Sequence, residues 1–238
     1  MAVRQRRSRK WLIALIVIAA ICLAPGALLR YLIGQSVAAK MPEMIGPARS
    51  YSVGVSGGLF EIVQGRIDNI DIQGNDVKLA NGIVIDRLDV DLKGIRFKPD
   101  QTVTDVATTD FSASVTEKNL SDFLATSRPD MRDAKISFDD GKLLLSASTR
   151  VLATRTPVTI EGTLRIVNAS KLNLILNRCT ARGICVPGFM RGRIMHDVNP
   201  VLDTQQIGMG AKLKSVNISD GTITITGNAN VRQALVKK

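Results

Sequence analysis

The side chains that could perform catalysis are few, and most of them have a simpler explanation. Pairs of carboxylates can act as general acid and base, and Asp68, Asp71, Asp89 and Asp91 are candidates for this role. All four lie near turns or on strand faces expected to meet water, where an ionised group is easily hydrated. His196 is the only histidine, and the sequence contains no nucleophile elbow and no glycine-rich phosphate loop. The sequence therefore predicts a binding protein rather than an enzyme, with no cofactor.

The three cysteines suggest a disulfide more than a metal site. Cys22 lies inside a long apolar run, whereas Cys179 and Cys185 flank the loop-like stretch TARGI. In an oxidising compartment these two residues could close a small disulfide ring, and the alternative is two unpaired small residues. Two cysteines and one histidine do not supply the four ligands of a structural zinc site, so no metal is expected.

Nearly half of the net charge of +11 comes from the N-terminus, because five of the 32 basic residues and no acidic residue fall within the first ten positions. Binding of nucleic acid calls for a basic stripe with interleaved aromatic residues. The remaining sequence has neither, so nucleic acid is not an expected partner. Its mild basicity is compatible with an anionic membrane surface, and a plainly solvated surface is the commoner meaning.

Residues 11–29 carry no charged side chain and directly follow this basic cluster. Nineteen helical residues at about 1.5 Å each span about 28 Å, close to the hydrocarbon thickness of a bilayer. Trp11 and Tyr31 are placed for the two membrane interfaces. We therefore expect residues 1–10 in the cytoplasm, a single-pass membrane anchor at residues 11–33, and residues 34–238 outside the cytoplasm.

A cleaved signal peptide is the alternative to this anchor. Its apolar core is usually only about 7–15 residues long. A cleavage-like sequence, Ser36-Val37-Ala38, lies well beyond the apolar run. The length of the run therefore favours a retained anchor, while both alternatives imply export.

Alternation of apolar and polar residues dominates the rest of the chain. Leu88, Val90 and Leu92 alternate with Asp89 and Asp91, which face the other way. This period of two predicts strands with one dry and one wet face, as in antiparallel sheets. Turns are expected at residues 80–82, 139–141, 168–170 and 219–222, and three of them contain Asn-Gly or Asp-Gly.

Three segments favour helix over strand. Residues 116–124 have apolar side chains at helical spacing, with Thr116 or Ser114 as the N-cap. Helix is also expected over residues 34–46, ending before Pro47, and around residues 198–207 despite Pro200. The fold class is therefore α+β, mostly β: a transmembrane helix followed by one domain with a large curved sheet.

Several segments are similar to the LmeA family of exported phospholipid-binding proteins. The stretch GLFEIVQGRIDNI at residues 58–70, followed by VKLANGI at 77–83 and LDVDL at 88–92, resembles the family's opening strands. The strand at 111–115 with the helix at 117–124, and the hairpin LKSVNISDGTITITG at 213–227, resemble its later elements. The similarity covers residues 45–229, nearly all of the exported part.

This resemblance implies a tubular lipid-binding fold, in which a long, strongly twisted antiparallel sheet curls around one or two helices and leaves an apolar groove. The partners would be a phospholipid or another envelope lipid and the membrane. The groove would be lined by dry strand faces and the short helix, with these residues as candidates: Ile70, Ile72, Leu88, Val90, Leu92, Phe111, Leu120, Phe123 and Leu124. Ordinary core packing is the alternative for each of them. Arg66, Arg87 and Lys93 are candidates for contact with phosphate, or are simply solvated cations.

Two functions follow from these features. The first is a membrane-anchored carrier or sensor of envelope phospholipids, which requires an apolar groove. The second is a non-catalytic structural or protein-interaction module of the cell envelope, with a filled core and an exposed edge or patch as its contact surface.

Overall fold

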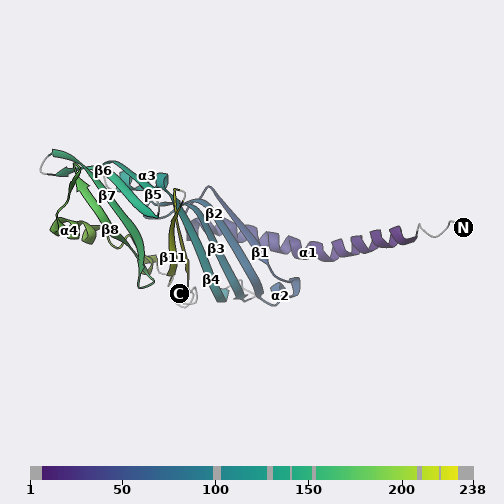
Figure 1. The fold of residues 1–238 in the computed structure, drawn as a ribbon. Coiled ribbons are helices and arrows are strands. Elements are labelled where there is room, and N and C mark those ends of the chain that lie inside the picture. Colours follow the sequence, from purple (N-terminus) through teal and green to yellow (C-terminus); the bar gives the residue numbers. More distant parts are fainter. Residues whose placement is uncertain are drawn as a thin grey trace.

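The protein consists of two antiparallel β-sheets side by side, with a long helix that lies along the first sheet and continues beyond it (Figure 1). The computed structural model describes residues 7–98, 103–127, 131–139, 141–151, 154–207, 211–219 and 221–229, and its account of side chains begins at Gly26. The long helix is α1 (Arg7–Met44). Shorter helical elements are α2 (Leu59–Val63), α3 (Glu117–Ser127), α4 (Gly188–Val198) and the 3₁₀ turn η1 (Thr204–Ile207).

Sheet 1 takes its last two strands from the C-terminal region, whereas the strands of sheet 2 follow one another in chain order. Sheet 1 runs, from edge to edge, through β1 (Ser50–Ser56), β2 (Arg66–Lys78), β3 (Val84–Phe97), β4 (Val103–Thr116), β12 (Thr222–Asn228) and β11 (Lys212–Ser219). Sheet 2 runs through β10 (Leu202–Asp203), β8 (Lys171–Ala181), β7 (Thr154–Val167), β6 (Lys142–Val151) and β5 (Arg132–Asp139), with β9 (Ile184–Cys185) paired to β8.

The strand pairing follows the alternation in the sequence. Ile72 pairs with Val90, and Val90 pairs with Phe111, so these three side chains lie on one face of sheet 1. The strand over residues 88–92 is confirmed as part of β3. The turn at residues 168–170 is confirmed too, because Asn168 and Ala169 have φ values of 54° and 53°, which tight hairpins favour.

The two Asp-Gly hairpins also form as predicted. Residues 139 and 142 pair at the end of the β5–β6 hairpin, and residues 219 and 222 pair at the end of β11–β12. Gly141 and Gly221 have φ values of 76° and 69°, a region that glycine adopts at little cost. Asp140 and Asp220, the other residues of these turns, lie outside the described residues.

The second half of α1 belongs to the folded domain. Its apolar side chains recur every four residues and form a single stripe, made of Leu29, Ile33, Val37 and Met41. The stripe packs on the apolar face of sheet 1. Gly34 allows a close approach of helix and strand, because a Cβ atom there would lie 2.8 Å from the carbonyl oxygen of Val53. The helix ends at Met44, which confirms the expectation that it stops before Pro47.

Most of the predicted membrane anchor, residues 11–33, precedes Gly26, the first residue whose burial the structure describes. Among the residues that the structure does describe, no helix combines the length and the apolar character that a bilayer crossing needs. The basic segment at residues 1–10 also lies outside the described side chains.

The prediction of one long sheet is wrong, because the strands form two sheets. After β4 the chain enters α3 instead of turning back, and β4 pairs with β12 from the C-terminal region. α3 then covers the edge of sheet 2: the backbone N–H groups of Ile136 and Phe138 in β5 donate to Ser121 Oγ and Glu117 Oε1. Since these two donors are satisfied by α3, β5 has no need of a further strand.

The helix predicted around residues 198–207 is wrong in position. α4 ends at Val198, and Asn199 has an extended backbone with φ −94° and ψ 140°. A residue that precedes proline is pushed out of the helical region by the proline ring, which explains the stop before Pro200. The following residues form β10 and the short turn η1.

Candidate functional site

A continuous apolar face runs along both sheets. Four clusters of buried side chains lie along it, and we call the side of each sheet that carries them the inner face. Val90 contacts two of these clusters in sheet 1. Ala113 leads to the next cluster, because it pairs with Ile225 across β4 and β12. Leu145 and Leu164 then connect to the cluster beneath α4.

The strand residues expected to line a groove all lie on this inner face. Ile70, Ile72 and Leu88 are buried, with 7%, 5% and 7% of their surface exposed. Val90 and Leu92 are half-buried. The stripe of α1 covers the part of the face around Ile70 and Ile72, so at this end the helix occupies the space that a groove would otherwise offer.

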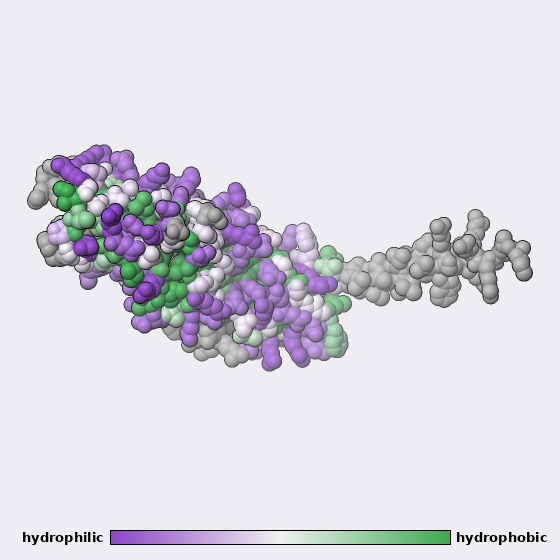
Figure 2. All heavy atoms as spheres, viewed as in Figure 1, coloured by the Kyte–Doolittle hydropathy of each residue, from purple (hydrophilic) through white to green (hydrophobic). Residues whose placement is uncertain are grey.

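Phe111 lies on the same face, one strand beyond Val90. Its ring sits over Gly227 of β12, where a Cβ atom would lie 2.5 Å from Phe111 Cζ. Phe111 is only half-buried, as are several neighbours on the inner face. We call this half-buried set the middle section: Phe111, Ala113, Val115, Leu145, Leu164, Val216 and Ile225. Hydrophobic residues also reach the surface together where sheet 2 meets β11 (Figure 2).

The three candidates from the short helix do not all point to the same place. Leu120 and Leu124 pack against the same cluster as four residues of the middle section, Leu145, Leu164, Val216 and Ile225. Phe123 instead lies beside the β2–β3 turn, 3.9 Å from the position of a Cβ atom on Gly82. The N-cap is Thr116, whose Oγ1 accepts a hydrogen bond from the backbone N–H of Asn119 at 3.4 Å.

A row of carboxylates lies on the outer face of sheet 1, opposite α1. Asp71, Asp91 and Asp110 form a row across β2, β3 and β4. Lys93 Nζ lies 2.7 Å from Asp91 Oδ2, and Lys214 Nζ donates to Asp110 Oδ1 at 2.6 Å. The hydrogen bond with Asp91 raises the pKa of Lys93, and the one from Lys214 lowers the pKa of Asp110. Asp91 and Asp110 of this row are thus engaged in ion pairs, and among the described residues no group of three or more metal-binding side chains converges.

Two of the three cations considered for phosphate contact are engaged by carboxylates. Arg87 Nε lies 2.8 Å from Asp89 Oδ2, and this hydrogen bond raises the pKa of the guanidinium group. Lys93 is held by Asp91 in the same way. Arg66 differs from both, because it borders a pocket beside a second arginine.

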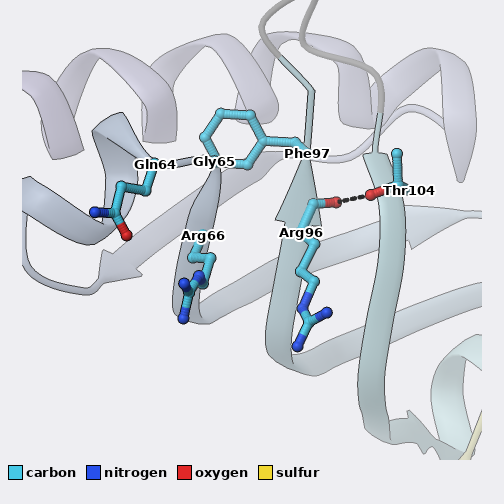
Figure 3. Close-up of a pocket in the computed structure, with 6 residues that line it drawn as sticks. All are labelled: Gln64, Gly65, Arg66, Arg96, Phe97 and Thr104. Atoms are coloured by element: carbon cyan, nitrogen blue, oxygen red, sulfur yellow. Dashed lines mark hydrogen bonds between the residues drawn. The ribbon is translucent and has the colours of Figure 1, made fainter.

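This pocket lies at the end of sheet 1 next to α2 and has a volume of about 360 Å³. It is lined by Gln64, Gly65, Arg66, Arg96, Phe97 and Thr104 (Figure 3). Arg66 and Arg96 are register partners on β2 and β3, and their side chains extend to the same side, away from α1 (Figure 3). Thr104 Oγ1 donates to the carbonyl oxygen of Arg96 at 3.1 Å.

Two like charges opposite each other on neighbouring strands repel, so this pair of arginines favours an anion between them. A second pocket adjoins the first and shares both arginines with it. Asp68 and Asp105 also line this second pocket and reduce the positive charge near the arginines. Sequence reasoning singled out Arg66 but missed Arg96. Arg96 could be found only from the register of β2 against β3, which places it opposite Arg66 although the two residues are 30 positions apart in the sequence.

The predicted disulfide between Cys179 and Cys185 is not formed, and both residues are free thiols. Cys185 pairs with Thr180 across β8 and β9. Adjacent residues of a strand point to opposite faces, so the side chain of Cys185 lies on the other side of the sheet from Cys179. Cys179 is a core residue with 2% of its surface exposed, and burial raises the pKa of its thiol.

Comparison with known proteins gives one family. A family model described as LmeA-like phospholipid-binding matches residues 25–228. No curated protein and no solved structure matches the chain. The family match begins just before the apolar stripe of α1 and continues through both sheets to the end of β12. Because it covers most of the chain, including the whole inner face, the protein belongs to the LmeA-like phospholipid-binding family.

Proposed function

We propose that this protein is a membrane-anchored, extracytoplasmic phospholipid-binding protein that carries or senses envelope lipids on its middle section. Membership of a phospholipid-binding family supports a lipid ligand. The observation that supports the place of binding is the exposure of the middle section, whose apolar residues stay half-buried while the ends of the inner face are covered by α1 and α4.

The chemistry of the middle section suits acyl chains. Its side chains are aliphatic apart from one aromatic ring, and they come from five strands: β4, β6, β7, β11 and β12. Each methylene group that moves from water onto such a surface contributes about 0.8 kcal/mol. An acyl chain laid across it would therefore gain several kcal/mol without any polar contact.

The anchor in this proposal rests on the sequence. Residues 11–29 are uncharged, and the five basic residues before them favour a cytoplasmic N-terminus. α1 joins this run to the stripe that packs on sheet 1. Because helix is continuous between the two, an anchored protein would hold its inner face at a fixed distance from the bilayer.

The role we propose is non-catalytic. Of the carboxylates considered for acid–base chemistry, Asp71, Asp89 and Asp91 lie on the outer face, and Asp89 and Asp91 have ion-pair partners there. They are on the side of sheet 1 opposite the apolar face, where a bound acyl chain would lie.

Native mass spectrometry of the full chain, released from gentle detergent, tests this function. The protein should carry phospholipid, and Ile225→Thr should lower the fraction that carries it, because the change places a hydroxyl group in the middle section. Ile175→Thr is the matched control, since Ile175 is 39% exposed on the outer side of β8.

Equal lipid occupancy of Ile225→Thr and Ile175→Thr would place the binding site elsewhere. A full chain that carries no lipid at all would overturn the proposal and favour the structural or protein-interaction module.

A further inference from the structure

Large apolar side chains are exposed at the end of sheet 1 where α1 leaves the domain. They come from α1 and α2, and we call them the apolar tip: Leu28, Tyr31, Leu32, Leu59, Phe60 and Val63. Phe60 and Val63 are 76% and 75% exposed. Hydrophobic residues are visible at this end of the molecule, beside α2 and the emerging helix (Figure 2). Large apolar side chains exposed together at one end of a molecule mark a site of interaction rather than ordinary solvent exposure.

The exposure of α2 is imposed by its packing. Ile62 is 4% exposed and is inserted into the core cluster beneath α1. On a helix of five residues, burial of Ile62 turns the remaining apolar side chains outward. The start of the helix is fixed by a hydrogen bond from the backbone N–H of Gly58 to Glu61 Oε2, at 2.9 Å. The tip is therefore a built feature of the fold.

The level at which α2 contacts α1 indicates what the apolar tip binds. A Cβ atom on Gly26 of α1 would lie 3.7 Å from Leu59 Cβ of α2, so the two helices touch at this level. Gly26 lies within the uncharged run of residues 11–29, three residues before its end. At about 1.5 Å per residue this is about 5 Å inside the run, which is the depth of the interface if the run spans a bilayer.

Charge at the same end of the molecule is also suited to a bilayer. Arg66 follows α2 after only two residues, and Arg96 lies opposite it. The two guanidinium groups extend from the end of sheet 1 into an open pocket (Figure 3). Arginine binds phosphate through several donors at once, so the pair is suited to lipid headgroups beside the inserted apolar side chains.

We infer that the apolar tip inserts into the outer interfacial layer of the same bilayer that holds residues 11–29, with Arg66 and Arg96 contacting lipid phosphates. This inference rests on the proposed membrane anchor and goes beyond it. It makes α2 a second point of attachment, which fixes the rotation of the domain about α1 and holds the end of sheet 1 against the membrane.

Tryptophan fluorescence of the full chain in vesicles of equal parts phosphatidylcholine and phosphatidylglycerol tests the inference. Trp11 is the only tryptophan, so the wild-type protein reports on the anchor. In a Trp11→Phe background, Phe60→Trp reports on the tip. Ile184→Trp is the matched control, because Ile184 in β9 is 74% exposed and belongs to sheet 2.

We expect lipids brominated near the headgroup end of their acyl chains to quench the tryptophan at position 60 severalfold more strongly than the one at position 184. Aqueous acrylamide should show the reverse order. If wild-type Trp11 is quenched by brominated lipid and position 60 behaves like position 184, the tip does not insert and the inference is overturned while the anchor stands.

If wild-type Trp11 is not quenched either, the anchor itself fails, and the inference fails with it. Protection of position 60 from acrylamide without quenching by brominated lipid would identify a protein as the occupant and would also overturn the inference. Lipid occupancy of the middle section is measured separately by mass spectrometry, so neither result depends on it.

Discussion

Phe111 owes its position on the inner face to a residue that has no side chain. Its ring fills the space above Gly227, where a Cβ atom would come within 2.5 Å of Cζ and would also meet the backbone of β11. Glycine inside a strand often marks such a close approach. The half-buried ring in the middle section therefore lies directly against the backbone of β12.

Gly227→Ala should destabilise the protein by about 1–3 kcal/mol, because the added methyl group must displace either the ring of Phe111 or the backbone of β11. The midpoint of urea unfolding measures this loss. Gly192→Ala is the control: no atom lies within 4 Å of a Cβ atom at Gly192 in α4, and alanine is the better helix former. Equal midpoints for the two variants would contradict the tight contact with Phe111.

At the residue scale, alternation alone could predict which side chains face inward. Ile72, Val90 and Phe111 are all recognisable as dry-face residues, and they do lie in one row. Alternation could not show that α1 covers Ile72 and leaves Phe111 half-buried, because residues 26–33 look like the end of the membrane anchor. The pairing of Arg66 with Arg96 was equally hidden, since it depends on the register of two strands.

At the scale of elements, α3 covers the edge of sheet 2 and joins the two sheets. Glu117 and Ser121 lie on one side of the helix, and each accepts a backbone N–H group of β5. Ser121 Oγ also donates to the carbonyl oxygen of Glu117 at 2.7 Å, which orients the hydroxyl group toward the strand. The helix thereby replaces a missing strand and joins the two sheets.

Glu117→Ala should lower the free energy of unfolding by about 1–3 kcal/mol, because the N–H group of Phe138 would lose its acceptor in a partly buried place. Hydrogen exchange should quicken at Phe138 before it changes in sheet 1. Lys118→Ala is the neighbouring control, since its ion pair with Asp122 is solvent-exposed and contributes little. Unchanged exchange at Phe138 in Glu117→Ala would show that the edge of β5 does not depend on α3.

Elements with strong local signals were predictable, and those without them were not. The helix at residues 116–124 has a cap and a clear period, and it forms at Glu117–Ser127. α2 has five residues, too few to show a period, and its helix depends on burial of Ile62. α4 was placed too late in the sequence because residues 198–207 contain apolar side chains at helical spacing, although Pro200 stops a helix from extending across it.

On the scale of the whole molecule, the boundary of the folded domain lies inside α1 and not after it. The stripe at residues 29–41 is part of the core of sheet 1, so a soluble form should begin at residue 26. A chain of residues 26–238 should keep the unfolding midpoint of the full-length protein and should lose only the helical circular dichroism signal of residues 7–25. A chain of residues 46–238 should be largely unfolded.

The expected difference follows from the energy of burial. Burying an apolar side chain contributes about 1.5–3 kcal/mol, and the shorter chain lacks all four residues of the stripe. Their sum is comparable with the total stability of a typical domain, about 5–15 kcal/mol. Equal thermal midpoints for the two truncated chains would show that α1 merely rests on sheet 1.

The split into two sheets could not be predicted from local patterns. The hairpins with turns at residues 80–82, 139–141, 168–170 and 219–222 were visible in the sequence, but a hairpin does not specify which strand lies beside it. Sheet 1 is completed by β11 and β12, which return to it after the chain has built sheet 2. That arrangement depends on contacts between distant parts of the chain, and the turn sequences carry no information about it.

The pairing of β4 with β12 has a consequence for how the protein comes into being. Its partners are between 106 and 118 residues apart in the chain, from Thr116–Thr222 to Asp110–Asn228. The chain is synthesised from its N-terminus onward. The edge of β4 that pairs with β12 therefore has no hydrogen-bond partner until the β11–β12 hairpin has been made. Such an edge is a template for aggregation, and closure over so long a loop is slow. A holding chaperone that shields the nascent chain until β12 is free should therefore raise the yield of this protein more than that of proteins built from neighbouring hairpins alone.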